Sequence, residues 1–241
     1  IFDHAFMKFR FSFFDFNKVY EETFDRVSCR SLNHDWFLAN VSQSRAPFYE
    51  VSKRIIDVVL ALMLAVPSLA LFPFVALAIK LEDGGPIFYK TERVGRFNKI
   101  IHLYKFRTKN GADSGDKALK SELVDTRIGA FLRKSRIDEL PQLINVLKGD
   151  LSFIGPRPEM PALAKVYAEK IPFYSTRHFI KPGLSGWAQI NEKDAPRGGI
   201  DLERTSTKLS YDLFYLKRHS LLLDLQTALR TITTLVERSG R

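Results

Sequence analysis

The adjacent carboxylates of Asp138 and Glu139 are the side chains in this sequence best suited to chemistry. An aspartate can act as a covalent nucleophile in phosphoryl transfer, and a neighbouring carboxylate can hold Mg²⁺ together with substrate phosphates. The neighbourhood is basic, with Arg133 and Arg136 close by in the sequence. A structural role is the alternative, because acidic residues at a helix N-terminus offset the helix dipole. The pair alone leaves both interpretations open.

Phosphoryl transfer also needs cationic groups around the phosphate oxygens. The sequence offers four candidates for phosphate binding: Lys105, Arg107, Arg133 and Arg157. Arg157 stands between Pro156 and Pro158, which restrict its backbone to extended geometry. Little entropy is then lost when its guanidinium binds a phosphate through two hydrogen bonds. A stiff turn with a solvated arginine is the simpler alternative.

The elements that must position these residues begin with a short helix after the acidic pair. Apolar residues recur at helical spacing from Leu140 to Leu147, and the Lys-Gly pair at 148–149 is a typical helix end. Pro141 is tolerated only in the first turn of a helix. The acidic pair is therefore expected at or just before the N-terminus of this helix, with Ser135 as a candidate cap.

A β-hairpin is predicted upstream, with strands at residues 87–89 and 100–107 joined by a turn. Strand alternation places Lys105 and Arg107 on one face of this hairpin and Phe106 on the other. Further elements are predicted from apolar periodicity: a strand at 9–13, a helix at 119–132 interrupted around Gly129, a helix at 161–170, and helices at 209–216 and 221–236.

An apolar run from Val58 to Ile79 contains no charged residue. Its roughly 22 residues would extend about 33 Å as a straight helix, enough to cross a bilayer core. Pro67 and Pro73 inside the run would each remove a backbone hydrogen bond and bend the helix. Basic residues flank both ends of the run: Lys53, Arg54, Lys80, Lys90, Arg93, Arg96 and Lys99. Since the positive-inside rule places such residues on the cytoplasmic side, the sequence predicts a broken helix that enters the membrane and returns.

Two alternatives to re-entry are a straight span and a buried soluble hairpin. With re-entry, Asp57 is expected at the lipid headgroup level, paired with Arg54 or a lysine. Residues 1–50 mix aromatic and charged side chains and begin with isoleucine, so we expect a fragment of a longer protein. The aromatic stretch around Trp36 is either an interfacial anchor or part of a core cluster.

Composition limits the classes of partner. The formal net charge of +10 favours nucleic acid, anionic lipid or a phosphorylated substrate. The single cysteine, Cys29, excludes an internal disulfide framework and a multi-cysteine metal site. The histidines show no metal-ligand spacing, and the sequence has neither a P-loop nor a G-x-G-x-x-G motif. Basic strands that carry aromatic residues could bind nucleic acid, but the apolar run favours a membrane instead.

Several stretches together resemble the bacterial sugar transferases, which are polyprenyl-phosphate phosphoglycosyl transferases of the monotopic superfamily. The set of motifs is far more specific than any one alone. The matching stretches keep the family's order from about residue 51 to the end: Lys53-Arg54 with Asp57, the apolar run, Val94-Gly95-Arg96, Tyr104-Lys105-Phe106-Arg107-Thr108, Arg133, Asp138-Glu139-Leu140-Pro141-Gln142-Leu143, 145–150, Gly155-Pro156-Arg157-Pro158 and 182–187.

The resemblance implies an α/β fold that is mostly α, with a re-entrant membrane helix at 51–81 whose ends are both cytoplasmic. Residues 82–241 would form a cytosolic catalytic domain with amphipathic interfacial helices and a small β-hairpin. Residues 1–50 would be the end of an upstream regulatory domain and a linker. Such an enzyme works at the cytoplasmic face of the bacterial inner membrane, in exopolysaccharide or glycoconjugate synthesis. Larger members lead us to expect a homodimer and no nucleic-acid partner.

The reaction implied by the resemblance is transfer of a sugar 1-phosphate from a UDP-sugar to polyprenyl (undecaprenyl) phosphate, with hexose 1-phosphate expected by analogy with larger members. Asp138 would attack the β-phosphate and carry the phosphosugar, and Glu139 would bind Mg²⁺. The implied supporting residues are Lys105, Arg107, Arg133 and Arg157 for phosphate binding, Pro156, Pro158, Arg177 and Gln189 as secondary candidates, and Pro67 and Pro73 at the membrane break. The competing class is a catalytically silent membrane-tethered scaffold or regulatory domain.

Overall fold

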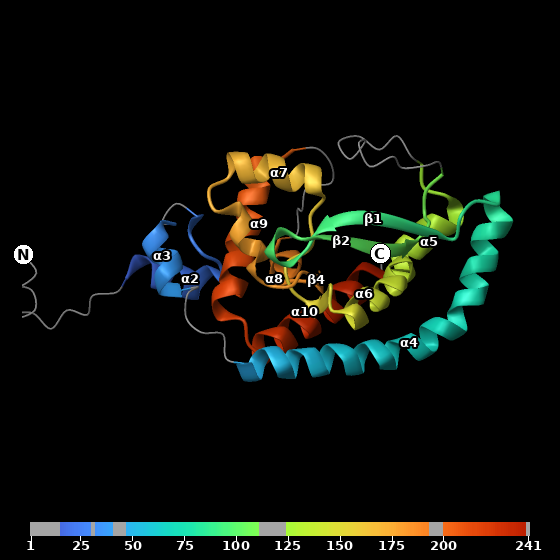
Figure 1. The fold of residues 1–241 in the computed structure, drawn as a ribbon, viewed down its shortest axis with the longest axis horizontal. Coiled ribbons are helices and arrows are strands. Elements are labelled where there is room, and N and C mark those ends of the chain that lie inside the picture. Colours follow the sequence, from blue (N-terminus) through green and yellow to red (C-terminus); the bar gives the residue numbers. More distant parts are fainter. Residues whose placement is uncertain (1–14, 30–31, 41–46, 111–123, 193–199, 240–241) are drawn as a thin grey trace, which may run out of the picture.

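The computed structural model describes residues 15–29, 32–40, 47–110, 124–192 and 200–239, and Figure 1 shows their arrangement. These residues are mostly helical, with two small two-stranded sheets, as the predicted fold class requires. The elements are α2 (Phe16–Phe24), α3 (His34–Asn40), α4 (Pro47–Asp83), β1 (Phe88–Val94), η2 (Arg96–Asn98), β2 (Ile100–Phe106), α5 (Arg127–Ser135), η4 (Ile137–Gln142), α6 (Leu143–Lys148), β3 (Ser152–Ile154), α7 (Pro161–Lys170), η5 (Tyr174–Phe179), β4 (Gly183–Ser185), α8 (Trp187–Asn191), α9 (Leu202–Arg218) and α10 (Leu221–Ser239).

Helix α4 is the longest element and the only described helix long and apolar enough to cross a membrane. Only 11% of its most apolar 18-residue window is buried against the rest of the described structure. A helix this apolar and this exposed is explained by a lipid environment. It runs along the lower edge of the molecule and then curves up beside α5 and the hairpin in its C-terminal half (Figure 1).

The predicted break at Pro67 and Pro73 is a bend within one continuous helix. Each proline leaves a carbonyl of the preceding turn without its N–H donor, which opens the helix on that side. The hydroxyl of Ser68 donates to the carbonyl of Leu64 at 2.6 Å and so supplies a donor near the first proline. The chain therefore bends at the prolines and remains one continuous helix.

Both ends of α4 are fastened to the same folded unit. Near the N-terminal end, the guanidinium of Arg54 donates to the carbonyls of Val146 and Leu147, each at 2.6 Å, at the C-terminus of α6. Near the C-terminal end, Asp83 forms an ion pair with Arg107. Glu82 accepts a 2.6 Å hydrogen bond from the backbone N–H at the start of α5.

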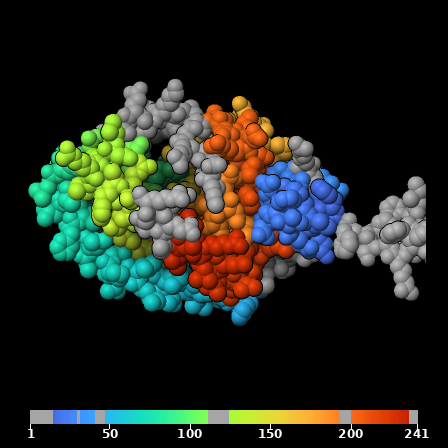
Figure 2. Space-filling model, turned by 180° about the vertical axis from the view of Figure 1, so that it is seen from behind, coloured from blue at the N-terminus to red at the C-terminus, as the bar shows by residue number. Residues whose placement is uncertain are grey.

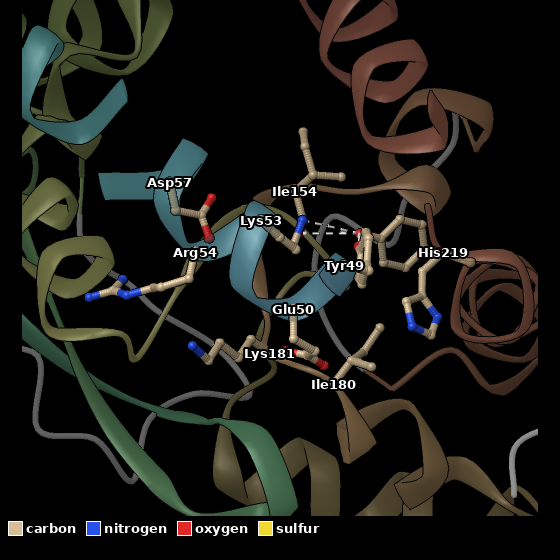
Figure 3. A pocket seen from close by; sticks show the side chains of 10 residues that line it. Tyr49, Glu50, Lys53, Arg54, Asp57, Ile154, Ile180, Lys181 and His219 are labelled. Carbon is tan, nitrogen blue, oxygen red and sulfur yellow. Dashed lines mark hydrogen bonds between the residues drawn. The ribbon is translucent and has the colours of Figure 1, made fainter. Parts of the chain in front are cut away.

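The first turns of α4 also contact the C-terminal helices (Figure 3). Lys53 Nζ lies 2.7 Å from Asp224 Oδ2 of α10, whereas Arg54 points away from Lys53. Asp57 is buried, and its Oδ1 accepts 3.0 Å hydrogen bonds from Ser152 Oγ and Phe153 N. The predicted pairing of Asp57 with Arg54 or a lysine was therefore wrong. The hydroxyl of Ser152 and the backbone N–H of Phe153, both on β3, bind its carboxylate instead.

The predicted hairpin is confirmed as the antiparallel pair β1–β2, with β1 extending to Val94. Phe106 is buried and packs against Val75 and Ile79 of α4 and Leu132 of α5. Phe106 thus points into the core under the bend, as strand alternation predicts. The predicted helix at 161–170 is confirmed as α7.

Helix α5 differs from its prediction. Its described part begins at Arg127, and the side chain of Thr126 caps it by accepting from Gly129 N at 2.8 Å. Gly129 lies in the first turn and does not interrupt the helix. A Cβ on Gly129 would stand 2.0 Å from the carbonyl oxygen of Thr108, so glycine allows this close approach to the end of the hairpin. The part of the prediction at 119–123 lies outside the described residues, as does the strand predicted at 9–13.

The N-terminal segment, residues 15–29 and 32–40, packs against α9 (Figure 2). Glu21 is buried, and its carboxylate lies 2.8 Å from Lys217 Nζ. Val27 N donates to Ser210 O at 3.0 Å. Trp36 is buried in the main core cluster. Of the two alternatives for the Trp36 stretch, the core cluster is therefore the correct one.

Candidate active site

The acidic pair lies on η4, a 3₁₀ helix between α5 and α6. Arg136 separates α5 from η4 and has a left-handed backbone, with φ of 60°. The α-helix that was predicted from Leu140 begins only at Leu143, because the 3₁₀ turn occupies the preceding residues. Ser135 is not a cap, since its hydroxyl donates back to carbonyls within α5. The pair is thus presented on a tight turn rather than on the first turn of the α-helix.

Asp138 is 7% exposed, and its Oδ1 has no hydrogen-bond partner among the described residues. Burial raises the pKa of the Asp138 carboxyl, against the field of Lys105, which lowers it. An unpartnered carboxylate oxygen in a buried place is costly unless a ligand or metal approaches it. This oxygen therefore marks a place for a binding or reacting group.

Glu139 receives the cations of three different elements. Its Oε1 lies 2.6 Å from Lys105 Nζ on β2, 3.4 Å from Arg157 Nη2 and 3.9 Å from Arg136 Nη1. Burial alone would raise the pKa of Glu139, but the fields of Lys105 and Arg157 outweigh it and lower the pKa to about 2. Glu139 is consequently ionised at neutral pH, beside a partner carboxyl whose charge burial disfavours.

The Pro-Arg-Pro turn holds Arg157 by its backbone as well as by its prolines. The carbonyl of Arg157 accepts a 3.0 Å hydrogen bond from Arg177 Nη2. Arg177 in turn forms a 2.7 Å ion pair with Asp212, and both side chains are 1% exposed. Arg177, a secondary candidate from the sequence, therefore acts on the site through the backbone of Arg157 and does not face a substrate itself.

The other predicted cations are placed differently. Arg107 pairs with Asp83 at the end of α4, so only Lys105 of the hairpin's two predicted cations reaches Glu139. Arg133 is half-exposed and pairs with Asp125 at 2.7 Å, while its field still acts on the pKa of Asp138.

Two further residues of the site were noted in the sequence but not assigned a role there. Arg136 contacts Glu139, and the spacing of three residues between them could have indicated it. Gln142 is 4% exposed, and its Nε2 has no partner among the described residues. It follows Pro141 within the same motif as the acidic pair. The secondary candidate Gln189 resembles it, since its Oε1 is buried without a described partner.

The acidic pair fits a magnesium ion that takes few protein ligands. The described residues contain no group of three or more His, Cys, Asp or Glu that could hold a metal ion. Mg²⁺ usually binds one or two carboxylates together with substrate phosphates and water. The ionised Glu139 and the unpartnered oxygen of Asp138 meet that requirement.

The family model for bacterial sugar transferases matches residues 48–238. The chain belongs to the bacterial sugar transferase family. The match includes the bent apolar helix, the hairpin, the acidic pair and the Pro-Arg-Pro turn. The N-terminal segment that packs on α9 lies outside it.

Curated relatives carry names that describe one type of transfer. The chain is 41% identical over 199 residues to the UDP-N-acetylgalactosamine-undecaprenyl-phosphate N-acetylgalactosaminephosphotransferase of Aeromonas hydrophila, covering 81% of this chain and 46% of the relative. It is 38% identical over 191 residues to the UDP-glucose:undecaprenyl-phosphate glucose-1-phosphate transferase of Caulobacter vibrioides, covering 78% of this chain and 70% of the relative. A transferase of the same name from Escherichia coli K12 is 36% identical over 184 residues, covering 75% of this chain and 39% of the relative. The chain thus spans less than half the length of two of these three relatives.

Proposed function

We propose that the chain transfers a sugar 1-phosphate, with hexose 1-phosphate as the leading case, from a UDP-sugar to undecaprenyl or another polyprenyl phosphate. The observation that carries this proposal is the buried, unpartnered oxygen of Asp138 beside a Glu139 that three cations surround. The names of the relatives support the same general reaction. Their differing sugars leave the choice of sugar to experiment.

The proposed chemistry takes two displacements at phosphorus. A carboxylate oxygen of Asp138 attacks the β-phosphorus of the UDP-sugar, the bond from that phosphorus to the bridging oxygen breaks, and UMP leaves with the bridging oxygen. An oxygen of the polyprenyl phosphate then attacks the same phosphorus and displaces Asp138. The product is a polyprenyl diphosphate sugar, and the carboxylate is regenerated.

The side chains around Asp138 have distinct tasks in these steps. Lys105 and Arg157 neutralise the charge of the phosphate oxygens as it builds up. The positive charges of Lys105, Arg136 and Arg133 favour the ionised carboxylate of Asp138 that the attack requires, although burial disfavours its charge. Glu139 would hold Mg²⁺, with Asp138 adjacent, and the ion would supply further positive charge at the phosphates.

The proposed site must meet a water-soluble nucleotide sugar and a lipid, and the attachment of α4 supports that arrangement. Arg54 near one end of α4 and Asp83 at the other both bind the unit that carries the acidic pair. A straight span of the bilayer core of about 30 Å would carry these ends to opposite sides. We therefore place both ends of α4 on the cytoplasmic side of the bacterial inner membrane, with the bend inside the lipid.

Release of UMP tests the reaction. The full chain in detergent or nanodiscs, with Mg²⁺ and undecaprenyl phosphate, should release UMP from one member of a panel that includes UDP-glucose, UDP-galactose and UDP-N-acetylgalactosamine. Asp138→Asn should abolish this release. A folded chain that releases no UMP with any donor would favour a catalytically silent scaffold, and full turnover by the Asn variant would refute the nucleophile.

Labelling of single cysteines tests the membrane arrangement. Val51 and Leu81 are 59% and 77% exposed near the two ends of α4, so each can carry a cysteine in a Cys29→Ser background. Both positions should react with an impermeant maleimide only when the cytoplasmic face is accessible. Labelling from opposite faces would show that α4 spans the membrane.

A further inference from the structure

Arg93 lies on the face of the hairpin that carries Lys105. The antiparallel register pairs Tyr89 with Lys105 and Arg93 with Ile101, and directly paired residues project to the same side of a sheet. Side chains alternate along a strand, so Tyr89 and Arg93 share this side. Lys105 binds Glu139 from this face. Arg93 therefore lies on the face of the hairpin that meets the acidic turn, although the sequence analysis assigned it only to the basic flank of the apolar run.

The end of β1 also adjoins the Pro-Arg-Pro turn. The backbone N–H of Val94 donates to the carbonyl of Glu159 at 2.9 Å, two residues beyond Arg157. Arg93 is partly buried there, and the charges that act on it include Glu159, Arg157 and Glu139. Burial lowers the pKa of the Arg93 guanidinium and Glu159 opposes this, but an arginine keeps its charge in proteins.

The two carboxylates whose charges act on Arg93, those of Glu159 and Glu139, already have other partners. Glu159 Oε2 lies 3.2 Å from Lys208 Nζ, and Glu139 Oε1 is shared among Lys105, Arg157 and Arg136. No ion pair within 4.0 Å joins Arg93 to another residue of the described ranges. A partly buried guanidinium without a counter-charge is unfavourable. An anionic ligand would supply the missing charge.

We propose that Arg93 is a further phosphate-binding residue, which binds the diphosphate of the UDP-sugar together with Lys105 and Arg157. The proposal rests on the proposed function of the same site. Arg93 and Arg157 repel each other as like charges. The two adjacent phosphates of a diphosphate can neutralise both guanidiniums, whereas a single phosphate can neutralise only one of them. The single phosphate of the polyprenyl acceptor is the competing ligand.

Substitution kinetics separate the two ligands. Arg93→Met removes the charge at similar length, Arg93→Lys keeps it, and Lys90→Met is a matched control on the exposed outer face of the same strand. In Arg93→Met the KM for UDP-sugar should rise about ten- to a hundredfold, the usual worth of a charged hydrogen bond. Arg93→Lys should restore part of the lost affinity for UDP-sugar. The KM for polyprenyl phosphate should stay unchanged in both Arg93 variants, and Lys90→Met should have the same KM values as the wild type.

Protection by UDP gives a second readout that needs no turnover. UDP with Mg²⁺ should raise the Tm of the wild type, and Arg93→Met should lose most of that rise. If no donor releases UMP and yet this loss is observed, the proposed reaction fails while the Arg93 site stands. If only the KM for polyprenyl phosphate rose, the assignment of the UDP-sugar diphosphate as the ligand of Arg93 would be wrong. Unchanged kinetics and UDP protection with a lower Tm would overturn the site and leave Arg93 as a structural partner of Glu159.

Discussion

Two charge clusters lie on either side of the Pro-Arg-Pro turn, and their difference shows which one is built for a ligand. The Asp212 cluster joins Arg177 and Lys208 with Asp212 and Glu159, and the Arg177–Asp212 pair is almost completely sealed from solvent. The Glu139 cluster sets Lys105, Arg136 and Arg157 around one carboxylate, beside a carboxyl that burial tends to protonate.

The Asp212 cluster is balanced in charge, whereas the Glu139 cluster has more cations than its carboxylates neutralise. A sealed, balanced cluster holds a backbone in place, as Arg177 does for Arg157. A partly exposed cluster with excess positive charge is completed by an anion from outside. Charge balance, rather than the size of any pKa shift, is therefore the property that distinguishes the functional cluster from the structural one.

Asp138→Asn is expected to give the largest difference between an effect on turnover and an effect on stability. UMP release should fall more than about a thousandfold, since the proposed covalent nucleophile is lost. Stability should stay the same or rise, because burial disfavours the Asp138 charge that the substitution removes. Steady-state kinetics and thermal unfolding of the same preparation measure both effects. A large loss of Tm with retained turnover would assign Asp138 to the fold instead.

The converse result is expected from Arg177→Met. The substitution leaves Asp212 buried without its cation, which should cost about 3–5 kcal/mol of unfolding free energy. Urea unfolding of the detergent-solubilised chain measures this loss. Arg177→Met combined with Asp212→Leu should recover much of it. If the single substitution left stability unchanged while abolishing turnover, the two clusters would not divide their tasks as we infer.

Lys105→Met should affect the ligand more than the fold. Removing the closest cation of Glu139 should raise the KM for UDP-sugar about tenfold or more, while Arg136 and Arg157 still contact the carboxylate. Arg107→Met is the matched control directly after the same strand, because Arg107 binds Asp83 instead. Equal effects on KM from both substitutions would mean that the hairpin's cations are not divided between the site and α4.

Acid should destabilise the fold through Glu139. Its pKa is about 2 in the folded chain and ordinary in the unfolded chain, so its contribution is complete above about pH 4.5 and is lost as the pH falls toward 2. The raised pKa of Asp138 acts in the opposite direction. The fall in Tm between these pH values should be smaller in Glu139→Gln than in the wild type. Identical pH profiles would show that the cations do not stabilise the ionised form.

The smallest effect is expected at the edge of the site. Arg133 and Asp125 have side chains that are 48% and 41% exposed, and such surface pairs contribute about 0–1 kcal/mol. Arg133→Ala should therefore leave the Tm almost unchanged. A modest loss of turnover is expected through the field of Arg133 on Asp138. A Tm loss as large as that of Arg177→Met would contradict the distinction between exposed and sealed charges.

The parts of the site that depend on residues adjacent in the sequence could be predicted from the sequence. The acidic pair, the proline-restrained Arg157 and the alternation that sends Phe106 inward all follow from local patterns. The helix start at Leu143 could not, because 3₁₀ and α hydrogen bonding compete over the same residues. Nor could the pairing of Arg107 with Asp83, which depends on where the bent α4 brings its last turn.

The docking of the N-terminal segment on α9 could not be predicted from the sequence, and it bears on how the chain can be divided. The family match begins at residue 48, yet Glu21 supplies the buried carboxylate for Lys217, and the carbonyl of Asp25 accepts a 2.9 Å hydrogen bond from Trp187 Nε1. A chain cut where family similarity begins would expose the indole of Trp187 and remove the counter-charge of Lys217 on α9. The region that matches the family is thus shorter than the region that folds together. A deletion series should therefore stop before residue 15.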